Sequence, residues 1–154
     1  CSNNFGPWQF PEKFIPVIIL SALDNKNIPI YGNGKNIRDW IDVRDHVRAL
    51  DLVLKKGKIG ERYNIGTDNQ LSNIVIAKKI CSILDKKKNK KNIFHEKLIS
   101  YINDRPGHDF RYAINNEKIT KDLHFKPKYK FEKSLEDTVL WYLDNLNWAK
   151  NKLK

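Results

Sequence analysis

Apolar residues recur every three or four positions along much of this chain, a spacing typical of helices that bury one face. Pro11 and Glu12 favour a helix start, because proline needs no backbone partner in a first turn and a carboxylate stabilises the positive helix end. Asp42 or Asp45 is placed to cap the next helix, and Gly57 to end it. The pattern predicts helices over residues 11–25, 43–56, 72–85 and 134–148, and a shorter one that Asn115 or Asn116 caps and that ends at Leu123.

Short extended segments separate these helices, and turn-forming residues bound them. They are predicted at residues 27–31, 36–42, 62–66, 98–102 and 110–114. The Gly32-Asn33-Gly34 turn predicts that the first two segments pair as a hairpin. The lysine-rich run 86–91 is predicted to be a solvated loop. The chain shows no repeats and no flexible linker, so we predict a small mixed α/β domain rather than a complete doubly wound sheet.

The composition is that of a globular protein with an excess of positive charge. Of its 154 residues, 40% are hydrophobic, and 29 Lys and Arg exceed 18 Asp and Glu for a net charge of +11. This balance suits an anionic partner, either a nucleic acid or a smaller anion such as a nucleotide diphosphate. Aromatic residues are not interleaved with the densest lysine run, as a single-strand binding surface requires. We therefore favour the smaller anion and keep a basic nucleic-acid-associated domain as an alternative.

Signals for a membrane or an oxidising compartment are absent from the sequence. The longest apolar stretch, residues 14–20, is interrupted by Pro16 and falls short of the roughly 20 residues that span a bilayer. Cys1 and Cys81 are too few for a disulfide framework or a zinc site. These features predict a cytoplasmic protein without a membrane partner. The chain begins at Cys1 and contains no methionine, so we expect it to be the back part of a longer polypeptide.

No self-sufficient catalytic constellation is recognisable. The chain has no G-x-G-x-x-G or G-x-x-x-x-G-K-[ST] phosphate loop, no H-E-x-x-H and no G-x-S-x-G. Its four histidines lack metal-ligand spacing, so no metal site is predicted. His46, beside Asp45 on a predicted helix, is interpreted as a surface histidine.

Several polar loops are better candidates for binding. Asn3-Asn4 precede a Gly-Pro turn, where amides satisfy backbone groups at a strand end or hydrogen-bond a ligand. Arg38 follows a Gly-containing turn and Arg105 lies in a Pro-Gly loop. These placements suit bidentate phosphate binding, although such arginines more often form surface salt bridges. The 104–108 loop concentrates rigid and ligand-capable residues. Binding of a nucleotide diphosphate is the function that these loops favour.

Six segments together resemble one family. They read S-N-N-F-G-P-W-Q-F-P-E-K-F-I-P (2–16), P-I-Y-G-N-G-K-N-I-R-D-W (29–40), Y-N-I-G (63–66), D-R-P-G-H-D (104–109), R-Y-A-I (111–114) and W-Y-L (141–143). Over nearly its whole length the chain resembles the dTDP-glucose 4,6-dehydratases, which are extended short-chain dehydrogenase/reductases. The Y-N-I-G element recurs across those reductases, whereas the D-R-P-G-H-D string is much more specific to the dTDP-glucose enzymes.

The resemblance implies a reaction that needs more than this chain. In the family, NAD takes a hydride from C4 of dTDP-glucose, water leaves across C5–C6, and the hydride returns to C6 to give dTDP-4-keto-6-deoxyglucose. The family's Gly-rich NAD fingerprint, Tyr-x-x-x-Lys pair and Asp-Glu pair have no equivalent here. Residues 1–154 are therefore expected to be the C-terminal nucleotide-sugar-binding portion, without the N-terminal NAD-binding Rossmann half. Such a chain is expected to be inactive alone, and the full-length enzyme to be a homodimer.

The family's binding residues carry over to matching positions. The resemblance places Lys13 and Phe14 at the diphosphate through a helix start, with Arg38 and Arg105 neutralising its charge. Asn4 is expected at the nicotinamide end of NAD, and Trp8 stands where a smaller or more polar aromatic is expected. The substrate-binding positions are Asn3, Lys13, Phe14, Pro29, Ile30, Tyr31, Arg38, Asn73, Asp104, Arg105, Pro106, Gly107 and His108, and no catalytic residue is carried over.

Two further expectations follow from the missing half. Val43, Val47, Leu50 and Leu54 share one face of the second helix. This face and the 62–66 strand are expected to pack on the NAD-binding half, so the isolated chain should expose apolar surface and be marginally stable. A non-catalytic nucleotide-sugar-binding module is the alternative to a portion of an active enzyme.

Overall fold

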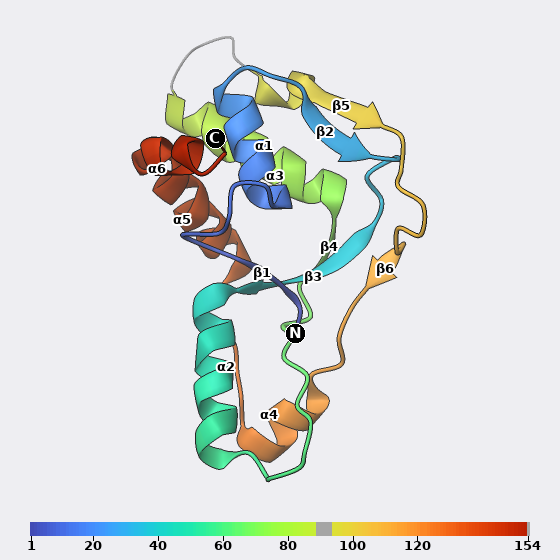
Figure 1. Cartoon of the computed structure of the whole chain (residues 1–154), viewed down its shortest axis with the longest axis vertical. Coiled ribbons are helices and arrows are strands. Elements are labelled where there is room, and N and C mark those ends of the chain that lie inside the picture. The colour runs from blue at the N-terminus through green and yellow to red at the C-terminus, as the bar shows by residue number, and fades with distance from the viewer. Residues whose placement is uncertain (89–93, 154) are drawn as a thin grey trace.

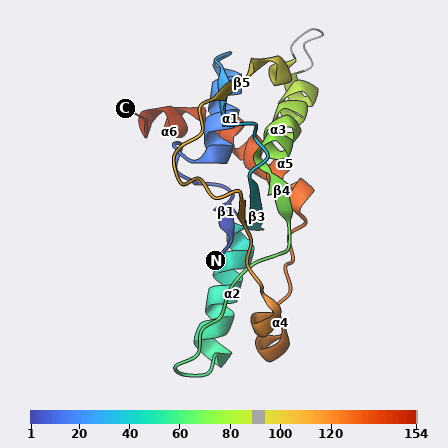
Figure 2. The same ribbon diagram turned by 90° about the vertical axis from the view of Figure 1, so that its right-hand side faces the viewer.

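A computed structural model describes residues 1–88 and 94–153 of the chain. In Figures 1 and 2, α1, α3, α5 and α6 gather above a small sheet, and α2 and α4 extend below it. No helix of this described part is long and apolar enough to cross a membrane. The elements are β1 (Asn3–Phe5), α1 (Phe14–Leu23), β2 (Ile28–Tyr31), β3 (Ile37–Asp42), α2 (Val43–Lys56), β4 (Gln70–Ser72), α3 (Asn73–Lys88), the 3₁₀ helix η1 (His95–Leu98), β5 (Ile99–Ile102), β6 (Arg111–Tyr112), α4 (Glu117–Leu123), α5 (Phe131–Asp144) and α6 (Leu146–Asn151).

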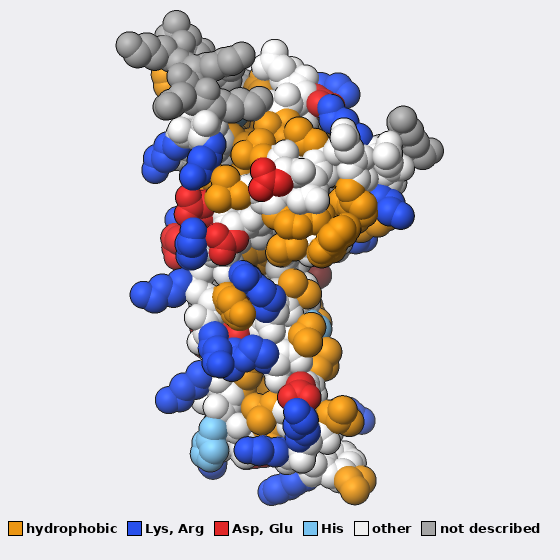
Figure 3. All heavy atoms as spheres, turned by 90° about the vertical axis from the view of Figure 1, so that its left-hand side faces the viewer, with side chains coloured by type: hydrophobic (Ala, Val, Ile, Leu, Met, Phe, Trp, Pro, Cys, Tyr) orange, Lys and Arg blue, Asp and Glu red, His pale blue; other side chains and the backbone are white. Residues whose placement is uncertain are grey.

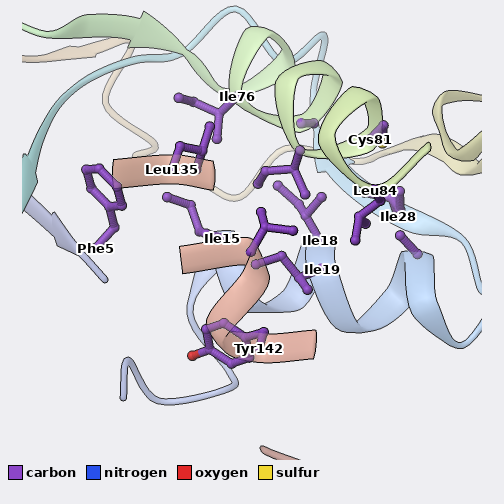
Figure 4. Close-up of a cluster of buried hydrophobic side chains, with 14 of the residues drawn as sticks. Phe5, Ile15, Ile18, Ile19, Ile28, Ile76, Cys81, Leu84, Leu135 and Tyr142 are labelled. Atoms are coloured by element: carbon purple, nitrogen blue, oxygen red, sulfur yellow. The ribbon is translucent and has the colours of Figure 1, made fainter. Parts of the chain in front are cut away.

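The main core lies where α1, α3 and α5 meet. Fully buried side chains from the three helices pack together, among them Ile18 from α1, Ile80 from α3 and Val139 from α5. On each helix these residues belong to the apolar face that the sequence periodicity predicts. Figure 4 shows this cluster, with Tyr142 at its edge. A separate, smaller cluster joins α2 to α4 through buried Ala49 and Ile119. The chain therefore has one substantial core above the sheet and a thin one below it.

β3 is the central strand of the larger sheet. It pairs in parallel with β1 and β6 and antiparallel with β4. β2 instead pairs in parallel with β5, from Ile28 opposite Ile99 to Tyr31 opposite Ile102. The predicted hairpin between residues 27–31 and 36–42 is therefore wrong. After the turn, Gly34 passes directly over Ile74, whose backbone N–H donates to the Gly34 carbonyl at 3.0 Å, and this contact directs the chain into a different sheet.

The helices follow the sequence pattern, with corrections at their ends. Helix α1 begins at Phe14, later than predicted, and α3 continues through Lys88; the rest of the lysine-rich run lies outside the described residues. The last predicted helix is two helices, because the backbone leaves helical geometry at Asn145, whose side chain donates to the Trp141 carbonyl at 2.8 Å. Residues 62–66 form no strand in the described chain, where the Ile65 carbonyl accepts from the Ser2 N–H at 2.8 Å.

Helix α2 presents its apolar face to the outside. Asp42 caps the helix as predicted, accepting from the Arg44 N–H at 2.8 Å, and Gly57 ends it. Val47 and Leu54 on the predicted apolar face are 57% and 86% exposed. The buried face instead carries Asp45, which holds the segment before α5. Figure 3 shows hydrophobic side chains scattered among basic ones on the lower half of the molecule, where α2 lies.

Candidate functional site

One end of the candidate site forms where β2 and β5 end side by side. The Gly32 N–H donates to the Ile102 carbonyl at 2.9 Å, and Gly32 packs against the Asp104 side chain. Asp104 Oδ1 lies 2.6 Å from His108 Nδ1, and this hydrogen bond holds the pKa of the Asp104 carboxyl below its ordinary value. The His108 ring lies edge-on to Tyr31, with centroids 6.1 Å apart. These contacts bring the predicted residues Tyr31, Asp104 and His108 together.

Arg38 lies in β3 next to this end and is only 8% exposed. Its guanidinium donates to the Ile37 carbonyl at 2.7 Å and to the Asp109 carbonyl at 2.9 Å. The Asn36 side chain donates to the same Asp109 carbonyl at 3.2 Å, so both residues hold the 104–110 loop. Within residues 1–88 and 94–153, no carboxylate forms a salt bridge with Arg38. A buried guanidinium without a counter-ion favours binding of an anion, because an unpaired buried charge is costly.

The start of α1 supplies a second feature that favours an anion. Lys13 occupies the N-cap position without a side-chain cap, and the first turn carries no acidic residue. The positive end of this helix is therefore not compensated by its own side chains. Phe14 stacks on Trp40 with ring centroids 6.0 Å apart. Trp40 is two residues from Arg38 on the same strand, so both side chains lie on one face of β3.

Asn3 and Asn4 lie on β1, with Asn3 opposite Trp40 in the sheet register. Paired residues share a face and neighbours alternate, so Asn3 shares the face of Trp40 and Arg38, whereas Asn4 lies on the other. Asn4 Nδ2 donates to the Ser2 carbonyl at 3.1 Å, but its Oδ1 is buried without a partner in the described chain. This orphaned acceptor fits a ligand amide, and the carboxamide of a nicotinamide has the required N–H donors.

The remaining predicted residues surround these features less directly. Asn73 is buried at the start of α3, and its N–H donates to the Asn36 carbonyl at 3.0 Å. The Ile30 side chain is fully buried in the core, so β2 can offer only its backbone there. Lys13 pairs with Glu12 at 2.7 Å, and Arg105 is exposed in the loop with Pro106 and Gly107.

Sequence reasoning missed two residues that organise the site. Asn36 ties β3 both to the 104–110 loop and to α3. Trp40, on the face of β3 that carries Arg38, stacks on Phe14 at the start of α1. The alternation of Arg38 and Trp40 along a strand was a signal that both face the same side. Nothing in the local sequence indicates the role of Asn36, because its partners lie far away in the chain.

The chain is thus a small mixed α/β domain in which Arg38 and Trp40 share one face of β3 and Phe14, at the start of α1, stacks on Trp40. Residues 1–138 match the model of the family described as GDP-mannose 4,6 dehydratase, and the chain belongs to that family. It is 52% identical over 151 residues to a dTDP-glucose 4,6-dehydratase of Shigella flexneri, covering 98% of this chain and 42% of the relative. The resemblance seen in the sequence is thus confirmed.

Solved structures give the same result. The dTDP-glucose 4,6-dehydratase of Bacillus anthracis, solved in complex with NAD, is 46% identical and superposes with a TM-score of 0.87, covering 99% of this chain and 46% of that one. The dTDP-glucose 4,6-dehydratase of Streptomyces venezuelae, solved with NAD, is 36% identical with the same TM-score of 0.87, covering 99% and 45%. The chain therefore spans less than half the length of the relatives that it matches.

Proposed function

We propose that this chain is the nucleotide-sugar-binding portion of a dTDP-glucose 4,6-dehydratase, and that it binds the dTDP moiety across β3. The observation that carries the proposal is the buried Arg38 guanidinium, which has no carboxylate partner in the described chain and shares a strand face with Trp40. A diphosphate would supply the missing negative charge. The chain's similarity to dehydratases named for dTDP-glucose supports this nucleotide.

In this proposal, different residues bind the diphosphate, the thymine, the nucleoside and the glucose. The diphosphate lies between Arg38 and the start of α1 at Lys13 and Phe14, with Arg105 closing from the loop. The thymine lies against Tyr31 and the backbone of Pro29 and Ile30. The nucleoside is surrounded by Asn73, Asp104, Pro106, Gly107 and His108. Asn3, on the same face of the sheet, is left to contact the glucose.

Asn4 is proposed to face NAD from the opposite side of β1. Its Oδ1, which has no partner among the described residues, would accept a hydrogen bond from the nicotinamide carboxamide of bound NAD. When bound, NAD accepts the C4 hydride and returns it at C6, while the protein supplies placement. The Gly-rich loop and the Tyr-x-x-x-Lys pair are not in this chain. We expect the chain alone to bind the nucleotide sugar without turning it over.

The exposed face of α2 is proposed to pack on an NAD-binding half. Val47, Leu50 and Leu54 form this apolar face, and the extended residues 62–66 run without strand partners in the described chain. A groove of about 700 Å³ between α2 and α4 adjoins it. Apolar surface of this kind marks an interaction site. We propose that dimerisation of the full-length protein uses that half, so we expect the chain alone to be monomeric.

Calorimetric titration of dTDP into the purified chain tests the nucleotide site. We expect binding by the unaltered chain and a loss of at least about tenfold in Arg38→Lys, since a lysine cannot reproduce the guanidinium fork. Lys35→Arg, a change at a neighbouring exposed residue, is the matched control and should bind normally. Equal affinity for GDP, or salt-sensitive binding of single-stranded DNA in place of dTDP, would contradict the proposal.

A further inference from the structure

The loop between β1 and α1 is anchored by the C-terminal helices. Tyr142 of α5 is fully buried, and its hydroxyl donates to the Gln9 backbone carbonyl. Gln9 Nε2 in turn donates to the Asn4 backbone carbonyl at 2.8 Å. In Figure 4 the Tyr142 ring borders the isoleucine cluster and its oxygen lies on the outer side. A continuous path of hydrogen bonds thus joins α5 to β1.

The same loop is held from outside by a cluster of three tryptophans. Trp8 adopts a φ of 64°, in the left-handed region that residues other than glycine rarely occupy. Its ring packs 4.8 Å from Trp141 and 5.1 Å from Trp148, and the latter two lie 5.2 Å apart. Such a conformation persists only where the surroundings fix it. α5 and α6 therefore determine the conformation of a loop that belongs to the other end of the sequence.

Both ends of this loop lead into the proposed site. Its first end follows Asn3 and Asn4, and its last end is the start of α1 at Lys13 and Phe14. Among the described residues, neither Tyr142 nor Gln9 forms a hydrogen bond with Lys13, Arg38 or Arg105. Burial raises the pKa of the Tyr142 hydroxyl, so that it remains a donor over the ordinary pH range.

We propose that Tyr142 and Gln9 are positioning residues for the diphosphate subsite: through their hydrogen bonds they fix the β1–α1 loop, and with it the first turn of α1. This inference rests on the proposed function, because it assumes that the diphosphate binds at that turn. The thymine subsite, formed by β2 and the 104–108 loop, has no part in the path. The two halves of the ligand should therefore respond differently when the path is broken.

Tyr142→Phe removes only the hydroxyl and breaks the path at its buried end. We expect it to weaken dTDP binding about three- to tenfold, the range that one hydrogen bond provides, while thymidine binding stays within about twofold. Affinities are read from amide shifts in two-dimensional NMR titrations, which also report whether the variant is folded. Tyr129→Phe is the control, since Tyr129 packs on Arg44 away from the path, and it should bind both ligands normally.

Gln9→Met breaks the path at its other end, in a half-buried side chain, and tests the inference if Tyr142→Phe does not fold. It should show the same selective loss of dTDP affinity. Equal weakening of dTDP and thymidine would overturn the inference in favour of a purely structural role, and so would unchanged dTDP affinity in a folded variant. Failure of the unaltered chain to bind either ligand would overturn the proposed function, and this inference with it.

Discussion

At the scale of single residues, burial and one close partner determine how each group behaves. The pKa of Cys81 is raised and that of Asp104 is lowered. Burial raises the pKa of the Cys81 thiol to about 12, and nearby Asp85 and Glu96 add to the rise. The His108 ring donates a hydrogen bond to the Asp104 carboxylate and so lowers the pKa of that carboxyl. The Cys81 thiol is therefore unreactive, and the Asp104 carboxylate keeps its negative charge at a lower pH than an ordinary aspartate does.

The two cysteines should differ in reactivity. The Cys1 thiol is exposed and the Cys81 thiol is buried. Because its pKa is raised to about 12, the Cys81 thiol stays protonated at pH 8. Because the thiolate is the nucleophile, we expect Ellman's reagent to label Cys1 rapidly and Cys81 only after denaturation. A Cys1→Ser variant isolates the second reaction. Rapid labelling of that variant in the native state would contradict the buried position of Cys81.

The Asp104–His108 hydrogen bond should make the loop sensitive to acid. The folded-state pKa of Asp104 is below the ordinary 3.8, so the stability that its carboxylate contributes is present above 3.8 and lost as pH falls through the lower value. We expect the NMR signals of Arg105, whose backbone N–H donates to Asp104 Oδ1 at 2.9 Å, to change as the pH falls below the ordinary 3.8 of Asp104. In Asp104→Asn the same signals should already be altered at neutral pH and show no such acid transition.

At the scale of elements, the sequence predicts what local periodicity controls and misses what distant contacts decide. The apolar spacing of Ile15, Ile18 and Ile19 predicts α1, and Asp42 predicts the start of α2. The hairpin prediction was wrong because β2 pairs with β5, about 70 residues further along, and no turn signal reports such a partner. The site residues came from a resemblance. Gln9 and Tyr142 also lie in resembling segments, but the hydrogen bond between them joins positions 133 residues apart, so the sequence did not show that they interact.

Asp45 should be the residue that ties α2 to the rest of the molecule. Its buried carboxylate accepts the backbone N–H groups of Lys128 and Tyr129, each at 3.0 Å, and pairs with Arg48. Asp45→Ala leaves these donors unsatisfied, so we expect it to lower the free energy of unfolding by about 3 kcal/mol. Urea denaturation measures the change. Asp51→Ala, at an exposed position on the same helix, should cost less than about 0.5 kcal/mol.

The outward face of α2 should tolerate charge. Leu54 is 86% exposed, so Leu54→Glu removes little packing and should change the unfolding free energy by less than about 0.5 kcal/mol. It should also weaken the binding of a separately supplied NAD-binding half, because it places a charge on the apolar face. Ala49→Glu on the buried face of the same helix should prevent folding. A large loss of stability in Leu54→Glu would show that this face packs within the chain.

At the scale of the whole molecule, stability should be uneven. The upper core joins α1, α3 and α5, whereas the lower cluster of α2 and α4 contains few buried residues. Regions with few apolar contacts open most readily. We expect amides of α2 and α4 to exchange hydrogen faster than those of α1 and α3, and α2 to become protected on addition of an NAD-binding half. Uniform protection across the chain would contradict this division.

The face of β3 that carries Arg38 and Trp40 is proposed to bind dTDP, and one NMR experiment tests this most directly. A two-dimensional amide NMR spectrum of the labelled chain is recorded with and without dTDP. We expect dispersed signals, with dTDP-induced shifts confined to Tyr31, Arg38, the 104–108 loop and the start of α1. Dispersed signals that ignore dTDP, or shifts centred on the lysine-rich end of α3, would contradict it.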